Sequence, residues 1–88
     1  MAKRTDSNQA EIVKALRAVG ASVESLHTVG KGVPDLLCGF RGSTFLLEVK
    51  TSTGKLRPSQ IDWRGAWYGH QPITVHSVDQ ALAAIGAV

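Results

Sequence analysis

The segment Thr44–Lys50 constrains the fold most, because apolar and polar side chains alternate along it with a period of two. Consecutive side chains of an extended chain point to opposite faces, so this pattern predicts a strand with one apolar face. Residues 35–40 are also predicted to form a strand, with Pro34 before its first residue, where proline is tolerated. The two residues between the strands, Arg41-Gly42, fit a tight turn. The sequence therefore predicts a β-hairpin, and the turn fixes which residues of the two strands face each other.

Residues 7–19 before the hairpin are predicted to form an amphipathic helix, capped by Asp6 or Ser7 and ended at Gly20. Its apolar stripe consists of Ile12, Val13, Leu16 and Val19. A strand is predicted between this helix and the hairpin, over residues 22–28.

A second helix is predicted to begin at Pro58, a favoured first helical residue, and to end at Gly69. A short strand over residues 73–76 follows it. A last helix then begins at the S-x-x-Q capping box of residues 77–80. A strand that reaches the next strand through a helix lies parallel to it when the two are neighbours. The expected fold is a small mixed α/β sheet flanked by helices.

The 88 residues are expected to form a single domain over 1–88, with residues 1–6 as a flexible basic arm. Hydrophobic residues make up 43% and charged residues 19%, which are ordinary values for a folded chain. No apolar run is long enough for a membrane span, and the N-terminal residues lack the apolar core of a signal peptide. The only cysteine, Cys38, cannot form an internal disulfide. We therefore expect a cytoplasmic protein without a membrane partner, and a net charge of +3 permits a nucleic-acid partner.

Counting outward from the Arg41-Gly42 turn places Asp35 directly opposite Glu48 on one face of the hairpin. Two unit charges about 4 Å apart repel by on the order of 4 kcal/mol at an effective dielectric constant of 20. A divalent cation between the carboxylates would remove this cost, and oxygen ligands favour Mg²⁺ or Mn²⁺. The backbone carbonyl of Val49 could supply a further ligand. Lys50 lies on the same face, where it could orient a water molecule or contact a phosphate.

This interpretation depends on a turn with an even number of residues, because an odd loop would separate the two carboxylates. The alternative is that Glu48 and Lys50 are ordinary exposed residues of a half-buried strand, as they would be in most chains with an E-x-K triplet.

Pro34-Asp35 followed by Glu48-Val49-Lys50, after one helix and one strand, resembles the PD-(D/E)XK nuclease superfamily. The later Gln60-Ile61-Asp62-Trp63 and the early Gln9 narrow the resemblance to the stand-alone virus-type replication-repair nuclease (VRR-Nuc) family, over residues 6 to 85. The resemblance implies a restriction-endonuclease-like αβββαβ core and metal-dependent cleavage of DNA. It assigns Asp35 and Glu48 as metal ligands and Lys50 as the catalytic lysine.

The resemblance further implies a homodimer that acts on branched or junction DNA in replication, recombination or repair, in a bacterial or phage-infected cell. Two alternatives stay open. One is a monomeric nicking nuclease, and the other is a catalytically silent DNA-binding or scaffold module of the same fold.

Several other residues are candidates for supporting roles. An acidic residue on the first helix is common in the family, and here Glu11 and Asp6 are the candidates, although Glu11 falls away from the apolar stripe. Gln9 falls on the inward face, and Gln60 could hydrogen-bond a site carboxylate or a phosphate. Four basic residues could hold the DNA backbone: Lys31, Lys55, Arg57 and Arg64. Trp63 and Trp67 could stack on unpaired bases, but packing in the core or in a subunit interface is the more common use of such residues.

Overall fold

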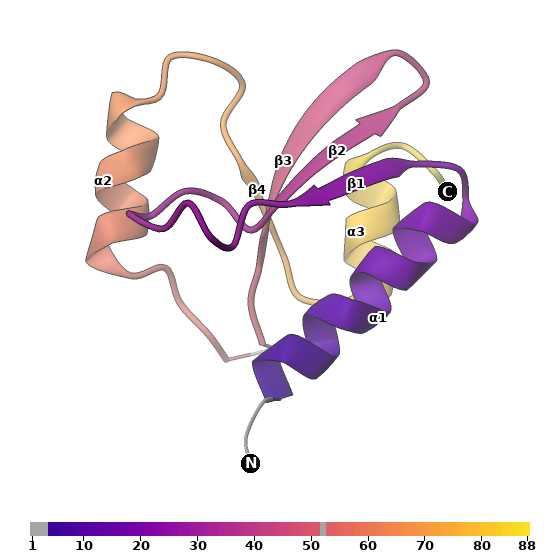
Figure 1. Ribbon diagram of the computed structural model, residues 1–88, viewed down its shortest axis with the longest axis horizontal. Helices are drawn as coiled ribbons and strands as arrows, with labels where there is room; N and C mark the ends of the chain where they lie inside the picture. Colours follow the sequence, from indigo (N-terminus) through magenta and orange to yellow (C-terminus); the bar gives the residue numbers. More distant parts are fainter. Residues whose placement is uncertain (1–3, 52) are drawn as a thin grey trace.

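The computed structural model describes residues 4–51 and 53–88, with side chains from Asn8 onward, and shows four strands and three helices (Figure 1). The elements, in chain order, are α1 (Arg4–Ala18), β1 (Ser22–Ser25), β2 (Leu36–Phe40), β3 (Ser43–Val49), α2 (Pro58–Ala66), β4 (Ile73–Val75) and α3 (Val78–Ala84). This order is the predicted one.

The strands form one mixed sheet in the order β1-β2-β3-β4. The first three strands pair antiparallel, and β3 pairs with β4 in parallel through the crossover that contains α2. Arg41 and Gly42 both have positive φ angles, of 51° and 84°, as a two-residue hairpin turn of the type I′ class requires. Phe40 consequently faces Ser43 and Leu36 faces Leu47, so the predicted register is confirmed.

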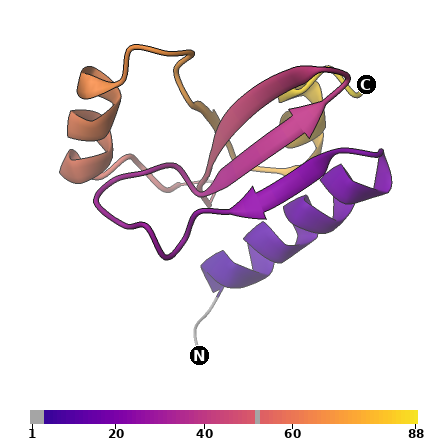
Figure 2. The ribbon, with the colours of Figure 1, turned by 45° about the horizontal axis from the view of Figure 1, so that its top comes forward.

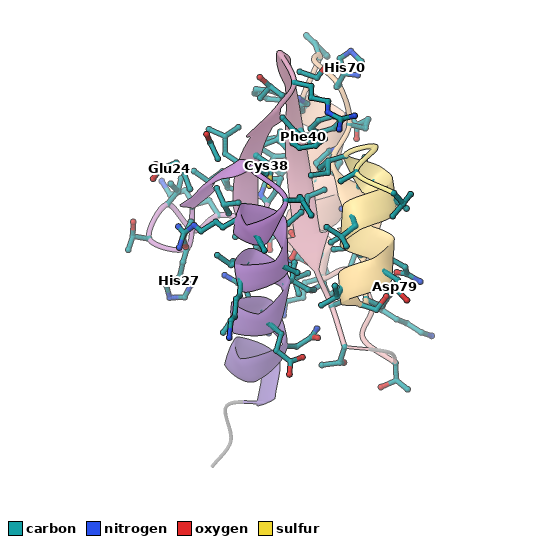
Figure 3. The ribbon with its side chains drawn as sticks, turned by 90° about the vertical axis from the view of Figure 1, so that its right-hand side faces the viewer. Glu24, His27, Cys38, Phe40, His70 and Asp79 are labelled. Atoms are coloured by element: carbon teal, nitrogen blue, oxygen red, sulfur yellow. The ribbon has the colours of Figure 1, made fainter. Side chains whose placement is uncertain are left out.

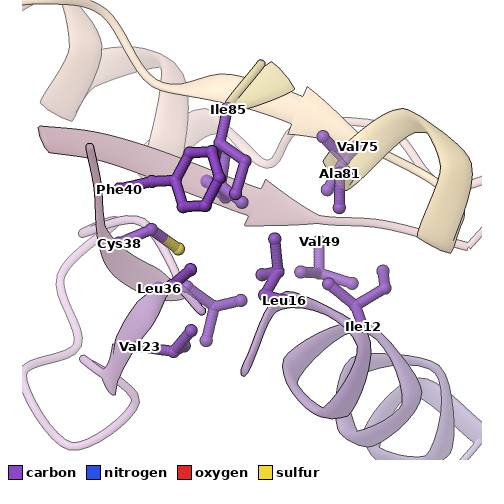
Figure 4. Close-up of a cluster of buried hydrophobic side chains, with 12 residues drawn as sticks. Ile12, Leu16, Val23, Leu36, Cys38, Phe40, Val49, Val75, Ala81 and Ile85 are labelled. Carbon is purple, nitrogen blue, oxygen red and sulfur yellow. The ribbon is translucent and has the colours of Figure 1, made fainter. Parts of the chain in front are cut away.

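The hydrophobic core lies between one face of the sheet and the helices α1 and α3 (Figures 3 and 4). Ile12 and Leu16 of α1 are fully buried, and Ala81 and Ile85 meet them from α3 and its end. The sheet contributes alternate residues of each strand, among them Val23, Leu36, Cys38, Phe40, Leu47, Val49 and Val75. Cys38 is fully buried and is a small core side chain, as expected, and this burial raises the pKa of its thiol to about 11.

The helix α2 lies on the opposite face of the sheet, away from the other two helices (Figures 1 and 2). None of its nine residues is buried. Trp63 and Trp67 stack on each other with ring centroids 4.8 Å apart, and Trp67 is 41% exposed. A cavity of about 420 Å³ between these tryptophans and the sheet is lined mainly by apolar side chains, including Leu37 and Leu46. The structure therefore leaves the α2 side of the sheet only partly covered.

Several sequence predictions differ from the structure at the ends of elements. The second helix was predicted to end at Gly69, but α2 ends at Ala66 because the backbone of Trp67 is extended. The helix α1 begins at Arg4, so residues 4–6 of the predicted basic arm are helical, and residues 1–3 lie outside the described residues. Asp6 and Ser7 are thus inside the first turn and not at the cap, a position that polar and acidic residues also favour. The strand predicted over 22–28 ends at Ser25, because the chain turns at Leu26, whose carbonyl accepts a hydrogen bond from the Val29 amide at 3.0 Å.

Ser77 caps α3 as expected, since its hydroxyl oxygen accepts a hydrogen bond from the Gln80 amide at 3.1 Å. The Gln80 side chain departs from the predicted capping box. Its Oε1 accepts from the amide of His76, at 2.7 Å, and not from that of Ser77.

Candidate active site

Asp35 and Glu48 meet on the face of the sheet that lies toward α2. Asp35 directly precedes β2, and the register of the hairpin places it opposite Glu48 of β3. The Asp35 carboxylate Oδ2 accepts a hydrogen bond from the Val49 amide at 2.8 Å, which fixes this side chain against β3. The two-residue turn therefore brings two carboxyl groups together at the end of the hairpin far from the turn.

The Glu48 side chain is buried, with 2% of its surface exposed. Its Oε2 atom accepts a hydrogen bond from Gln60 Nε2 at 2.9 Å and lies 3.7 Å from the ammonium group of Lys50. Burial raises the pKa of Glu48 from its ordinary value of 4.5 to about 7, and the neighbouring Asp35 adds to the rise by charge repulsion and a hydrogen bond. The charges of Lys50 and Arg64 lower this pKa, but by less.

Gln60 holds the Glu48 carboxylate in place. Its Oε1 accepts a hydrogen bond from the Arg57 backbone amide at 2.7 Å, immediately before α2 begins. This contact defines which way the Gln60 amide group points, so its Nε2 donates to Glu48. Of the two roles expected for Gln60, contact with a site carboxylate is the one that the geometry supports.

Lys50 is positioned through its backbone at both ends. Its amide donates to the Val75 carbonyl at 3.0 Å, and its carbonyl accepts from Asn8 Nδ2 at 3.3 Å. The first contact extends the parallel pairing of β3 with β4, and the second ties the end of β3 to α1. The backbone of Lys50 is thus held by both β4 and α1, which fixes the starting point of its side chain beside Glu48.

Arg64 lies one turn after Gln60 on α2 and approaches the same face of the sheet. Its guanidinium Nη2 donates to Thr74 Oγ1 at 3.0 Å, and Thr74 is the register partner of Glu48 on β4. The positive charge of Arg64 is near enough to act on the pKa of Glu48. Arg64, which was expected to contact DNA, therefore belongs to the surroundings of the carboxylate pair.

The donor atoms fit a hard divalent cation. The half-buried Asp35 meets the buried Glu48, and a bound cation would offset both their repulsion and the cost of burying Glu48. In a strand the N–H and C=O of one residue point to the same side, so the Val49 carbonyl lies on the side from which its amide reaches Asp35. Among the described residues no three His, Cys, Asp or Glu side chains cluster. A Mg²⁺ ion would need only one or two carboxylates, because water and phosphate oxygens fill its other positions.

Other predicted residues lie farther from the carboxylates. Glu11 is exposed on α1, as its place on the helical wheel indicated, and Gln9 lines an open cavity between α1 and β1. Neither forms a hydrogen bond with the site in the described part of the chain. Lys55 is exposed in the loop before α2. Asp6 has no described side chain.

Asn8 is the residue on α1 that reaches the site, and the sequence analysis missed it. It precedes Ile12 and Leu16 by four and eight residues, so it continues the buried stripe of α1 toward the N-terminus. A polar residue on that stripe was the signal that could have identified it.

Of three comparisons with known proteins, the comparison with solved structures found a similar chain. No protein-family model matches the chain, and no curated protein matches it. A solved structure described as a VRR_NUC domain is similar to it, with a TM-score of 0.77 and 27% sequence identity. The similarity covers 96% of each chain.

Proposed function

Because the chain belongs to the VRR-Nuc family of the PD-(D/E)XK nuclease superfamily, we propose that it is a Mg²⁺- or Mn²⁺-dependent DNA endonuclease. The observation that carries this proposal is the opposed pair Asp35 and Glu48. The ammonium group of Lys50 lies 3.7 Å from Oε2 of Glu48. The similarity to a VRR_NUC domain structure extends over 96% of the chain, so it supports the nuclease interpretation beyond these few residues.

In the proposed reaction, water adds to phosphorus and one P–O bond of the DNA backbone breaks. Asp35, Glu48 and the Val49 carbonyl would hold the cation, which would supply Lewis-acid activation of the phosphoryl group and of the water. Gln60 keeps Glu48 oriented for this role. Lys50 has three donors and no lone pair while charged, so it would contact the phosphate or the attacking water. The positive charge of Arg64 would add to the stabilisation of the developing negative charge.

We further propose that two copies form a homodimer through the α2 side of the sheet. Trp67 is 41% exposed, and Ile61, Tyr68 and Ile73 are exposed on α2 and in the residues that follow it. Together with the apolar cavity behind the tryptophans, these side chains form a surface that a second copy could cover. A two-fold pair would present two active sites at a fixed spacing, which suits paired incisions in branched or junction DNA in replication, recombination or repair.

The proposal is tested with purified protein on labelled duplex, flap and four-way-junction DNA, in Mg²⁺, Mn²⁺ or EDTA. We expect cleavage that EDTA abolishes and that Asp35→Asn abolishes. Asp62→Asn is the matched control, because Asp62 is exposed on α2 and its substitution also removes one carboxylate. DNA binding without cleavage in any of these metals would instead support a silent binding module. Cleavage by a monomer, without paired incisions, would support a nicking nuclease.

A further inference from the structure

A small pocket adjoins the carboxylate pair on the Asp35 side and has a volume of about 220 Å³. The residues that give it its chemical character are His27, Lys31, Arg57, Ser59, Asp35 and Gln60. We call it the basic pocket. It lies between the loop that joins β1 to β2 and the first turn of α2, two segments that approach each other in both ribbon views (Figures 1 and 2).

The β1–β2 loop is shaped so that it can pack directly on α2. Gly30, Lys31 and Gly32 all have positive φ angles, of 71°, 57° and 83°. A Cβ atom at Gly32 would lie only 2.1 Å from the Ser59 carbonyl oxygen, so only glycine allows this approach. The base of the loop is closed by the Leu26 amide, which donates to the Asp35 carbonyl at 2.8 Å. The loop therefore holds Lys31 at the mouth of the basic pocket.

Positive charge dominates the basic pocket. Lys31 comes from the loop and Arg57 from the residue before α2, and both side chains are exposed. Within the described part of the chain, neither of them forms a salt bridge. His27 adds a third nitrogen-bearing side chain from the start of the loop. The only acidic side chain of the wall is Asp35, which the proposed function assigns to the cation.

The basic pocket and the proposed metal site share a wall. Asp35 and Gln60 both line the basic pocket, and both also contact the proposed metal site. Gln60 donates a hydrogen bond to Glu48, and Asp35 lies opposite Glu48. A group bound in the basic pocket would thus be next to the cation without replacing it. The volume suits a single phosphate group with its water or sugar, and it is far too small for a duplex.

We propose that the basic pocket binds a phosphate of the DNA strand adjacent to the phosphate that is cleaved. The inference rests on the proposed function and specifies how the substrate strand is positioned in it. Contacts to a neighbouring phosphate fix the register of the strand, so that one phosphodiester is presented to the carboxylate pair. The same chemistry would accept an internal phosphodiester or a terminal phosphate.

The test is a scan of binding with fluorescein-labelled DNA in which one phosphate at a time is replaced by a neutral methylphosphonate. Binding is measured by fluorescence anisotropy in EDTA, so cleavage does not interfere. The scan is made with the wild-type protein and the double variant Lys31→Gln/Arg57→Gln. Arg41→Gln is the matched control, since it removes a cation at the turn, at the opposite end of the hairpin from Asp35.

For the wild type and Arg41→Gln, we expect one methylphosphonate position to weaken binding by about tenfold, the effect of one lost charge-assisted hydrogen bond. The double variant should bind every DNA more weakly. At that one position the methylphosphonate should no longer weaken its binding further, while the other positions keep their effects. Strands ending in a 5′-phosphate or a 5′-hydroxyl distinguish a terminal from an internal phosphate. Because the substituted side chains are exposed, urea unfolding should show wild-type stability.

The same profile of sensitivity in the wild type and the double variant would overturn the inference, as would a wild-type protein that does not bind DNA. The failure of the proposed function is a separate outcome. Cleavage in Mn²⁺ with an unchanged profile would reject the basic pocket and keep the nuclease. A position-specific loss of sensitivity without cleavage in any metal would keep the basic pocket and reject the nuclease.

Discussion

Asp35→Asn should abolish cleavage. In the metal-free protein it should nevertheless raise the free energy of unfolding relative to the wild type, and more so at alkaline than at acidic pH. The substitution removes a charge that opposes the ionisation of buried Glu48. It keeps an oxygen that can accept the hydrogen bond from the Val49 amide, now 2.8 Å from Asp35 Oδ2. The change therefore separates the repulsion between the two carboxylates from the contact that holds Asp35 in place.

The magnitude follows from the pKa of Glu48, which is raised from 4.5 to about 7 in the folded protein. A carboxyl group with a raised pKa stabilises the fold at pH values below its unfolded pKa, and this contribution is lost as the pH rises through 7. A shift of this size corresponds to at most about 3 kcal/mol between pH 4.5 and pH 8. Burial is the largest cause of the shift and remains in the variant. We therefore assign about 1 kcal/mol to the charge of Asp35.

The measurement is urea unfolding in EDTA at pH 5 and pH 8, followed by the fluorescence of Trp63 and Trp67. The stability of Asp35→Asn relative to the wild type should be about 1 kcal/mol more favourable at pH 8 than at pH 5, because Glu48 is protonated at pH 5 and the repulsion is absent. Added Mn²⁺ should stabilise the wild type at pH 8 and not the variant. Asp62→Asn, on the exposed surface, should show no such dependence on pH. A relative stability that does not change, or that falls between pH 5 and pH 8, would refute the reasoning.

Three further predictions concern single side chains. Lys50→Ala should lower the cleavage rate by about two to four orders of magnitude and leave Mn²⁺ affinity similar or slightly tighter, since a positive charge 3.7 Å from Glu48 is removed; calorimetric titration that shows no Mn²⁺ binding would contradict this. Gln60→Ala should weaken Mn²⁺ binding or activity by about tenfold to a hundredfold, because Glu48 loses the donor that orients it; unchanged titration and kinetics would contradict this. Trp67→Ala should shift light scattering from about 19 kDa, twice the 9.4 kDa chain, toward the monomer mass and reduce paired junction incision more than duplex nicking. A wild-type monomer at micromolar concentration that still makes paired incisions would argue against the dimer.

The central part of the site could be predicted because its geometry depends on local features of the sequence. The Arg41-Gly42 turn sets the register, and the register alone places Asp35 opposite Glu48. The alternation along β3 then places Lys50 on the same face. None of these steps requires knowledge of how distant segments pack.

The contacts around this centre depend on tertiary packing and could not be predicted in the same way. The periodicity of α2 indicated which residues share a face, but it could not show that the helix lies on the sheet without a buried residue. The contact between Gly32 and Ser59 joins the β1–β2 loop to the first turn of α2, two segments that are far apart in the sequence. The bond from Asn8 to the Lys50 carbonyl spans 42 residues and required the packing of α1 against the end of β3.

The attachment of α2 has a consequence for the order in which the molecule opens. With no buried side chain, this helix is held to the sheet and loops largely by polar contacts, among them Gln60 to Glu48 and Arg64 to Thr74. The helix α1, by contrast, buries Ile12 and Leu16 completely. Regions with few buried apolar contacts open locally at free energies well below that of global unfolding. The amide hydrogens of α2 should therefore exchange with solvent earlier than those of α1. In such an opening Glu48 would lose its contact with the Gln60 amide group while the sheet and core stay folded.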